Sequence, residues 1–217
     1  MRKHLLLCLL SFAFLSACNT EAPPPAEEEA PPPPPTADEL YGRLRQPMEP
    51  VFQAAASNSS IGNGQRQQAV NGLQPVKLQM AAEPNAPEAF VRFVRDVEDL
   101  IKQGKSAENY RVVKAGIMAY KLFEPSEKKY QEDEEYADLV LARPSVKIQG
   151  FFEVDGEPNV FLEVTDADDE TKKETYKVRE GEEFHTVLQL ERVIGNNQAI
   201  EVRYLPIDQA WVVDREK

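Results

Sequence analysis

The spacing of apolar residues changes along the chain, and each change predicts a different kind of segment. An apolar run over residues 5–15 is followed, over residues 21–35, by a stretch without core-forming side chains. Over residues 36–143 apolar residues recur every three or four positions, as on one face of a helix. Over residues 144–213 apolar and polar residues alternate, as on strands with one buried face. The pattern predicts an α+β protein, with a helical hairpin region followed by a small antiparallel β barrel or sandwich.

The helical region begins with a capping signal and soon meets proline. Thr36 stands three residues before Glu39, which is the spacing of a capping box. We expect a short helix that ends at Pro47, because proline removes a backbone donor and clashes with the preceding turn. A further turn of helix is expected over residues 48–56. The Gln-rich residues 65–83 contain an internal glycine and an internal proline, so their structure is left open.

The clearest helical pattern predicts a hairpin of two helices. The apolar stripe of the first helix consists of Phe90, Phe93, Val94, Val97, Leu100 and Ile101. We expect Asn85 to cap this helix and Gly104 to end it in a left-handed conformation. Ser106 is the expected cap of the second helix, which Glu124 and Pro125 end. A third helix is expected over residues 126–141. These stripes are interpreted as a helix–helix core, and a docking surface for another protein is the alternative.

Six short strands are expected in the β region. On the first strand, Val146, Ile148, Gly150 and Phe152 should point one way and Phe151 the other way. A turn is expected at Asp155 and Gly156, lengthened by residues 157–159. The remaining strands are expected at residues 160–164, 176–178, 187–194, 199–205 and 210–213.

Residues 1–17 resemble a bacterial lipoprotein signal peptide. A basic start precedes an apolar run that is too short to span a membrane, and Leu15-Ser16-Ala17-Cys18 follows the family's order of Leu, two small residues and Cys. The resemblance implies cleavage before Cys18 and acylation of its sulfur and amino group. The protein would then be lipid-anchored in the bacterial cell envelope, facing the periplasm, and Asn19 leaves the choice of inner or outer membrane open. An ordinary secreted protein with a chance cysteine is the alternative.

Residues 18–35 are expected to form the lipid anchor and a Pro/Glu-rich disordered tether. Proline favours the extended polyproline II conformation, and residues 21–35 would reach about 45 Å at about 3.1 Å per residue. We interpret the segment as a semi-rigid spacer between the bilayer and the folded part. A docking site for a proline-binding module is the alternative.

The net charge and the positions of the cysteines exclude some classes of partner and a disulfide bond. The chain carries 25 basic and 37 acidic side chains, with a net charge of −12. Nucleic acid is not expected as a partner, because phosphate neutralisation needs a basic surface. Of the two cysteines, Cys8 lies in the signal peptide and Cys18 at the lipid site, so no disulfide is expected in the mature chain. No later run is apolar and long enough for a membrane helix.

The β region also carries a family resemblance over about a third of the chain. The similar segments are Gly150-Phe151 at the end of the first strand, the strand that runs to Thr165-Asp166, the Tyr-Lys-Val-Arg-Glu-Gly-Glu turn of residues 176–182, and residues 190–193 and 200–202. They resemble the periplasmic β domain of the type IV pilus alignment lipoprotein and of the inner-membrane clamp component of type II secretion. The longer helical middle and an extra strand with Trp211 depart from that family.

The resemblance implies a scaffold protein. Its β domain would contact the periplasmic domains of a secretin, and its N-terminal part would contact inner-membrane pilus alignment proteins. Residues 214–217 would form a short tail.

Residues typical of catalysis are few. His185 is the only histidine of the mature chain, so a Cys/His zinc site is not expected, and we expect His185 at a surface or strand edge. Asp166, Asp168 and Glu170 alternate as calcium ligands can, but the glycine and distal glutamate of a calcium loop are missing, which favours a solvated hairpin tip. We therefore expect a protein that is not an enzyme, with no catalytic residue, cofactor or metal.

Protein–protein contact is the function that remains. Phe151 and Trp211 are candidate aromatic anchors at an interface, although a core position is preferred for Trp211. Strand addition at an open sheet edge is a further means of binding. The alternative is a periplasmic lipoprotein that binds a small ligand in the β domain.

Overall fold

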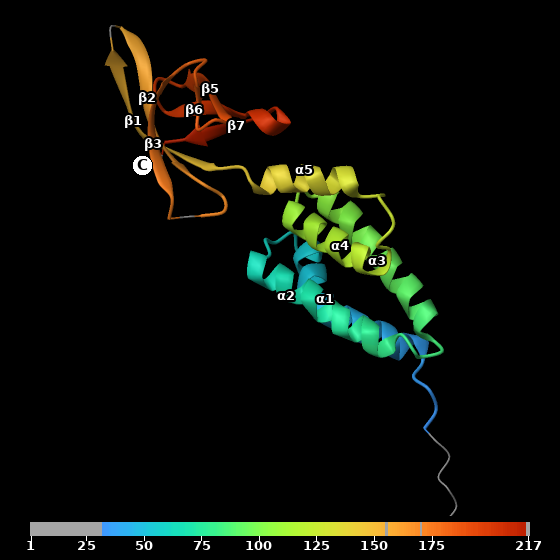
Figure 1. Cartoon of the computed structure of the whole chain (residues 1–217). Coiled ribbons are helices and arrows are strands. Elements are labelled where there is room, and N and C mark those ends of the chain that lie inside the picture. The colour runs from blue at the N-terminus through green and yellow to red at the C-terminus, as the bar shows by residue number, and fades with distance from the viewer. Residues whose placement is uncertain (1–31, 155, 170, 216–217) are drawn as a thin grey trace, which may run out of the picture. The chain divides into compact units, whose positions relative to one another are not determined.

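The computed structural model describes residues 32–154, 156–169 and 171–215 (Figure 1). These residues form helices and two antiparallel sheets, which confirms the α+β class. The helices are α1 (Ala37–Ala56), α2 (Asn63–Met80), α3 (Ala86–Ser106), α4 (Tyr110–Phe123) and α5 (Gln131–Leu141). Across the described ranges, no helix combines the length and apolar character needed to cross a membrane.

The start of α1 is the predicted capping box. The backbone N–H of Thr36 donates to Glu39 Oε2 at 2.8 Å, and the backbone N–H of Glu39 donates to Thr36 Oγ1 at 3.3 Å. The predicted end at Pro47 is wrong, because α1 continues through Pro47 and Pro50 to Ala56. Two segments that the sequence separates are therefore one helix.

Packing explains why α1 passes its prolines. Leu44, Met48 and Val51 are fully buried on one face of the helix. Each such side chain stabilises the fold by about 1.5–3 kcal/mol, which offsets the loss of about 3 kcal/mol expected at an internal proline. The ring of Pro47 fits against α2 at Gly72, where an added Cβ would lie 2.9 Å from Pro47 Cβ.

The predicted hairpin of α3 and α4 is present, with different ends. Gly104 does not end α3; it lies buried inside the helix, where an added Cβ would lie 2.9 Å from Val113 Cγ2. The left-handed conformation belongs instead to Glu108, with φ of 52°. Asn109, not Ser106, caps α4 by accepting a hydrogen bond from a backbone N–H of its first turn. Close packing of the two helices therefore decides the role of Gly104.

Two further helix starts differ from the sequence prediction. Asn85 precedes α3, but its side-chain nitrogen donates to Pro35 O at 2.8 Å instead of capping the helix. The helix predicted from Ser126 begins later, at the first residue of α5. The intervening segment places Tyr130 edge-on against Tyr120 of α4, with ring centroids 5.0 Å apart. This aromatic contact anchors the chain to the bundle before α5 starts.

Two sheets follow the helices. Their strands are β1 (Ser145–Val154), β2 (Glu157–Thr165), β3 (Lys173–Arg179), β4 (Glu183–Phe184), β5 (Leu188–Ile194), β6 (Ala199–Tyr204) and β7 (Gln209–Asp214), with a 3-10 turn, η1 (Leu205–Ile207), before β7. The orders are β1-β2-β3 and β4-β5-β6-β7. The sequence prediction missed the two-residue β4.

The two sheets enclose one apolar core, so they form a sandwich. The buried core side chains are Ile148, Val160, Leu162, Val164, Val178, Phe184, Leu188, Leu190, Ile200, Val202 and Tyr204. Strand β1 lies near β7 and β3 lies near β4, but no described ladder joins these pairs. The closed barrel, one of the two predicted forms, is not found among the residues that the structure describes.

A bulge in β1 overturns the predicted alternation of its side chains. The register with β2 shifts between Ile148 and Gly150. After this shift Phe151 packs against the sandwich core, whereas Phe152 stacks on Phe161 outside it. An extra residue in a strand moves every later side chain to the opposite face, which is the physical reason for the error.

The turn after β1 is tighter than predicted. The two strands pair as far as Val154 and Glu157, and Gly156 adopts φ of 83° between them. Residues 157–159 belong to β2 and do not lengthen the turn. The side chain of Asn159 is buried and donates to Glu157 O at 3.0 Å.

Candidate functional site

Cys18, the predicted lipidation site, lies outside the described residues, as does most of the tether. The other two predicted site residues, Phe151 and Trp211, lie in the β sandwich. They belong to β1 and β7, which are edge strands of different sheets and lie near each other.

Phe151 and Trp211 are both half-buried and pack against the sandwich core. The guanidinium carbon of Arg215 lies 5.9 Å from the Phe151 ring centroid, and that of Arg143 lies 4.8 Å from the Trp211 ring centroid. Arg143 Nη1 also donates to Gln209 Oε1 at 3.3 Å. Arg143 follows α5, so the Trp211 ring contributes both to the β core and to the contact between β7 and the end of the helical region.

Phe152, which is half-buried, and Phe161, which is exposed, form a stacked aromatic pair that the sequence prediction missed. Their ring centroids are 4.4 Å apart with an interplanar angle of 25°, and Phe161 is 41% exposed. Lys177 Nζ lies 5.0 Å from the Phe152 ring centroid. Aromatic residues surrounded by charged groups are typical of protein–protein contact sites. A glycine inside a strand often marks a bulge, so Gly150 could have indicated the bulge that turns Phe152 away from the sandwich core.

Charged residues near the pair form its rim. Glu163 lies two residues after Phe161, on the same face of β2. Its Oε1 lies 3.1 Å from Lys173 Nζ. Gln149 Nε2 donates to Glu163 Oε2 at 3.2 Å. The outer face of the β1-β2-β3 sheet therefore has an apolar centre and a polar border.

The edge strands differ in how open they are to strand addition. Strand β3 exposes Lys173, Glu174 and Lys177, and charged side chains on an edge oppose pairing with another chain. Strand β7 exposes Val212, at 51%, and alternates exposed with half-buried residues. The outer sheet face is thus a better candidate for partner contact than the β3 edge.

His185 lies just after β4, as expected for a strand edge, but its side chain is largely buried. Its Nε2 lies 2.8 Å from Asp166 Oδ1, and Lys172 Nζ lies 2.7 Å from Asp166 Oδ2. The hydrogen bond from Lys172, and to a smaller extent the charge of His185, lower the pKa of Asp166. Asp166 is therefore held as an ion-pair partner at the base of the β2–β3 connection.

The acidic residues of that connection do not converge. Asp169 accepts hydrogen bonds from the backbone N–H and the hydroxyl of Thr171, at 3.0 and 2.6 Å, which closes a local turn. Asp168 is exposed, and Glu170 lies outside the described residues. Within the described part of the chain, no group of three or more potential metal ligands is found.

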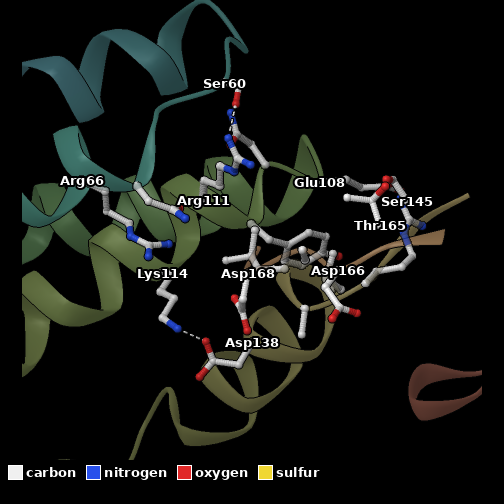
Figure 2. A pocket seen from close by; sticks show the side chains of 18 of the residues that line it. Ser60, Arg66, Glu108, Arg111, Lys114, Asp138, Ser145, Thr165, Asp166 and Asp168 are labelled. Atoms are coloured by element: carbon white, nitrogen blue, oxygen red, sulfur yellow. Dashed lines mark hydrogen bonds and ion pairs between the residues drawn. The ribbon is translucent and has the colours of Figure 1, made fainter. Parts of the chain in front are cut away.

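A polar cavity of about 1010 Å³ lies beside the helical bundle (Figure 2). Arg66 of α2 and Arg111 and Lys114 of α4 line it, together with Asp138 of α5. Figure 2 shows Lys114 directed at Asp138, with which it forms an ion pair, and Arg111 directed at Ser60. The sequence prediction missed this cluster, because residues from three helices approach one another only in the folded bundle.

The basic residues of this cavity differ in their partners. Arg111 Nη1 donates to Ser60 Oγ at 3.1 Å and to Ile61 O at 3.5 Å. Arg66 Nε and Nη1 are buried and have no hydrogen-bond partner in the described structure. Burial, and then the charge of Arg111, lower the pKa of Arg66. Among the described residues, neither guanidinium group forms an ion pair, although Asp138 also lines the cavity.

Comparison with known proteins assigns no family. No family model, no curated protein and no solved structure matches the chain.

Proposed function

We propose that this protein is a non-catalytic envelope lipoprotein that acts as a periplasmic scaffold in a type IV pilus or type II secretion assembly. The acyl chains on Cys18 anchor it to a bilayer, and residues 21–35 hold the folded part away from the lipid. The β domain contacts a secretin, and the helical region contacts inner-membrane alignment proteins. The signal sequence and the resemblance of the β region support this assignment.

The observation that carries the proposal is the stacked pair of Phe152 and Phe161, in which Phe161 is exposed. Two stacked aromatic rings lie on the outer face of a sheet, beside Lys177 and within a polar border. Burying such rings against a partner would release ordered water, and aromatic residues at the centre of an interface supply much of its binding energy. This face is the proposed contact for the secretin.

The interior of the β domain supports the scaffold over the alternative of a small ligand bound there. The space between the sheets is filled by fully buried apolar side chains, including Leu162, Leu188 and Ile200. A small polar ligand in that space would have to displace them. The outer surface is the part of the domain that offers contacts.

The test is crosslinking in cells with a photoreactive amino acid in place of Phe161. Capture followed by mass spectrometry is expected to recover a secretin. The matched control places the same amino acid at Arg192, on the exposed face of the other sheet, and is expected not to recover it. Equal recovery from both positions, or recovery of no secretin from Phe161, would show that the proposal is wrong.

Three substitutions complete this test. Phe161→Ser is expected to reduce secretin capture at least about tenfold, because loss of a central aromatic anchor costs about 2 kcal/mol or more. Arg192→Ser should leave capture unchanged. Cys18→Ala removes the acylation site, so it should release the protein from the membrane fraction. Circular dichroism of each purified variant checks that the change is not a loss of folding.

A further inference from the structure

We propose that Arg66, Arg111 and Lys114 form a binding site for a single phosphate-type dianion, either the free ion or the phosphate group of a monoester. This site lies on the helical region and is independent of the proposed scaffold contact on the β domain.

The helical bundle brings the three residues together. Helix α2 packs on α4, and α4 packs on α5. Arg111 and Lys114 are three residues apart on α4, so they share one side of that helix, and Arg66 approaches from α2. Figure 2 shows all three lining the same cavity. All three basic residues therefore belong to helices, and residues of the connecting segments complete the lining of the cavity.

The ion pairing of Arg66, Arg111 and Lys114 favours a dianion as the ligand. Lys114 is balanced by Asp138. Arg111 donates only to the neutral oxygens of Ser60 and Ile61, and in the described part of the chain neither Arg66 nor Arg111 forms an ion pair. The guanidinium groups of Arg66 and Arg111 therefore lack an ion-pair partner, and guanidinium groups bind phosphate oxygens with paired N–H donors. A phosphate-type dianion would balance both.

The burial of Arg66 shows what binding would gain. Its Nε and Nη1 are removed from water without an acceptor, which is costly for a charged group. The lowered pKa of Arg66 has the same cause, since burial and the charge of Arg111 both oppose its positive form. An anion would supply acceptors and the opposite charge at the same time.

The carboxylates that line the cavity favour a single phosphate group over a polyphosphate. Glu108, Asp166 and Asp168 also line the cavity. Asp166 already pairs with Lys172, while Asp168 is exposed and forms no ion pair with another described residue. A second phosphate near these carboxylates would be repelled. The cavity volume of about 1010 Å³ leaves room for the organic part of a monoester.

Calorimetric titration of the full chain in detergent tests the site. Inorganic phosphate and glycerol phosphate are the two probes, at constant ionic strength, with acetate as a monoanion. We expect saturable binding of one dianion per chain and much weaker binding of acetate. Tighter binding of the free ion or of the ester identifies which source the site prefers. No saturable binding of either probe, or equal binding of acetate, would overturn the proposal.

Variants locate the binding. Arg66→Met and Arg111→Gln are each expected to weaken binding of the preferred probe at least about tenfold, because each removes charge-assisted hydrogen bonds. The matched control is Arg95→Gln, which removes one positive charge from the exposed side of α3 and should leave the affinity unchanged. Equal weakening by Arg95→Gln would indicate a nonspecific charge effect and overturn the assignment.

A stability measurement separates a binding role from a structural one. Without the anion, Arg66→Met should leave Tm unchanged or raise it, since it replaces a guanidinium whose Nε and Nη1 are buried without partners. The preferred probe should raise Tm of the wild-type chain but not of Arg66→Met, because a ligand stabilises only the folded state that binds it. A marked fall in Tm of Arg66→Met, with the same response to the anion, would contradict the proposal.

Discussion

At the residue scale, two glycines decide how closely α3 and α4 pack. An added Cβ at Gly104 would lie 2.9 Å from Val113 Cγ2, and one at Gly116 would lie 2.7 Å from Ile101 Cγ1. Each glycine thus faces a branched side chain on the other helix. In both cases the missing side chain matters more than the conformational freedom of glycine, and neither φ is positive.

We predict opposite effects of alanine at two glycines of the bundle. Gly116→Ala should lower the free energy of unfolding by about 1–3 kcal/mol, because the new methyl group overpacks against Ile101. Gly42→Ala, on the exposed side of α1 with no atom near its added Cβ, should raise it by up to about 1 kcal/mol through helix propensity. Urea unfolding measures both. If Gly116→Ala instead raises the free energy of unfolding, α3 and α4 can move apart enough to accept the methyl group without losing stability.

At the element scale, β2 carries two different tasks on its two faces. Val160, Leu162 and Val164 are buried in the sandwich, whereas Phe161 points outward. Its pairing with both β1 and β3 places it at the centre of its sheet. The strand therefore supplies the core with one face and the proposed partner contact with the other.

We predict that alanine substitutions along β2 separate stability from binding. Leu162→Ala should destabilise the β domain by about 2–5 kcal/mol, because it leaves a cavity in a filled core. Phe161→Ala should cost no more than about 1.5 kcal/mol, chiefly the contact with Phe152. Thermal unfolding of the two variants checks the difference. Comparable losses would mean that Phe161 is mainly a structural residue.

Some elements could be predicted from the sequence, and others could not. The capping box at Thr36, the α3–α4 hairpin and the strand pattern of β2 follow from local spacing, and the structure contains them. The continuation of α1 through Pro47 could not be derived, because distant partners such as Gly72 determine it. Gly150 indicated that a bulge was possible, but one glycine in the sequence does not specify how β1 pairs with β2.

At the scale of the whole molecule, the described chain has two hydrophobic cores. One is built by the helices and the other by the two sheets. The protein contains one tryptophan, Trp211, which packs against the β core. Arg143 connects the two regions through its contacts with Trp211 and Gln209.

We predict that the two cores respond separately to substitution. Leu162→Ala should lower the unfolding midpoint followed by Trp211 fluorescence and leave the helical signal in circular dichroism nearly unchanged. Gly116→Ala should have the opposite pattern, because residues in separate cores share no contacts. If each variant shifts both signals equally, the helices and sheets unfold as one cooperative unit.

The sequence by itself determined the α+β class and the order of a helical region before a β region, because these depend on periodicities within short segments. It also yields the signal peptide and tether predictions for residues 1–35, of which residues 1–31 lie outside the described structure. Only the tertiary structure stacked Phe152 on Phe161 and brought Arg66 to Arg111 and Lys114. Strand register and helix packing join residues far apart in the chain, and local spacing carries no information about which of them meet.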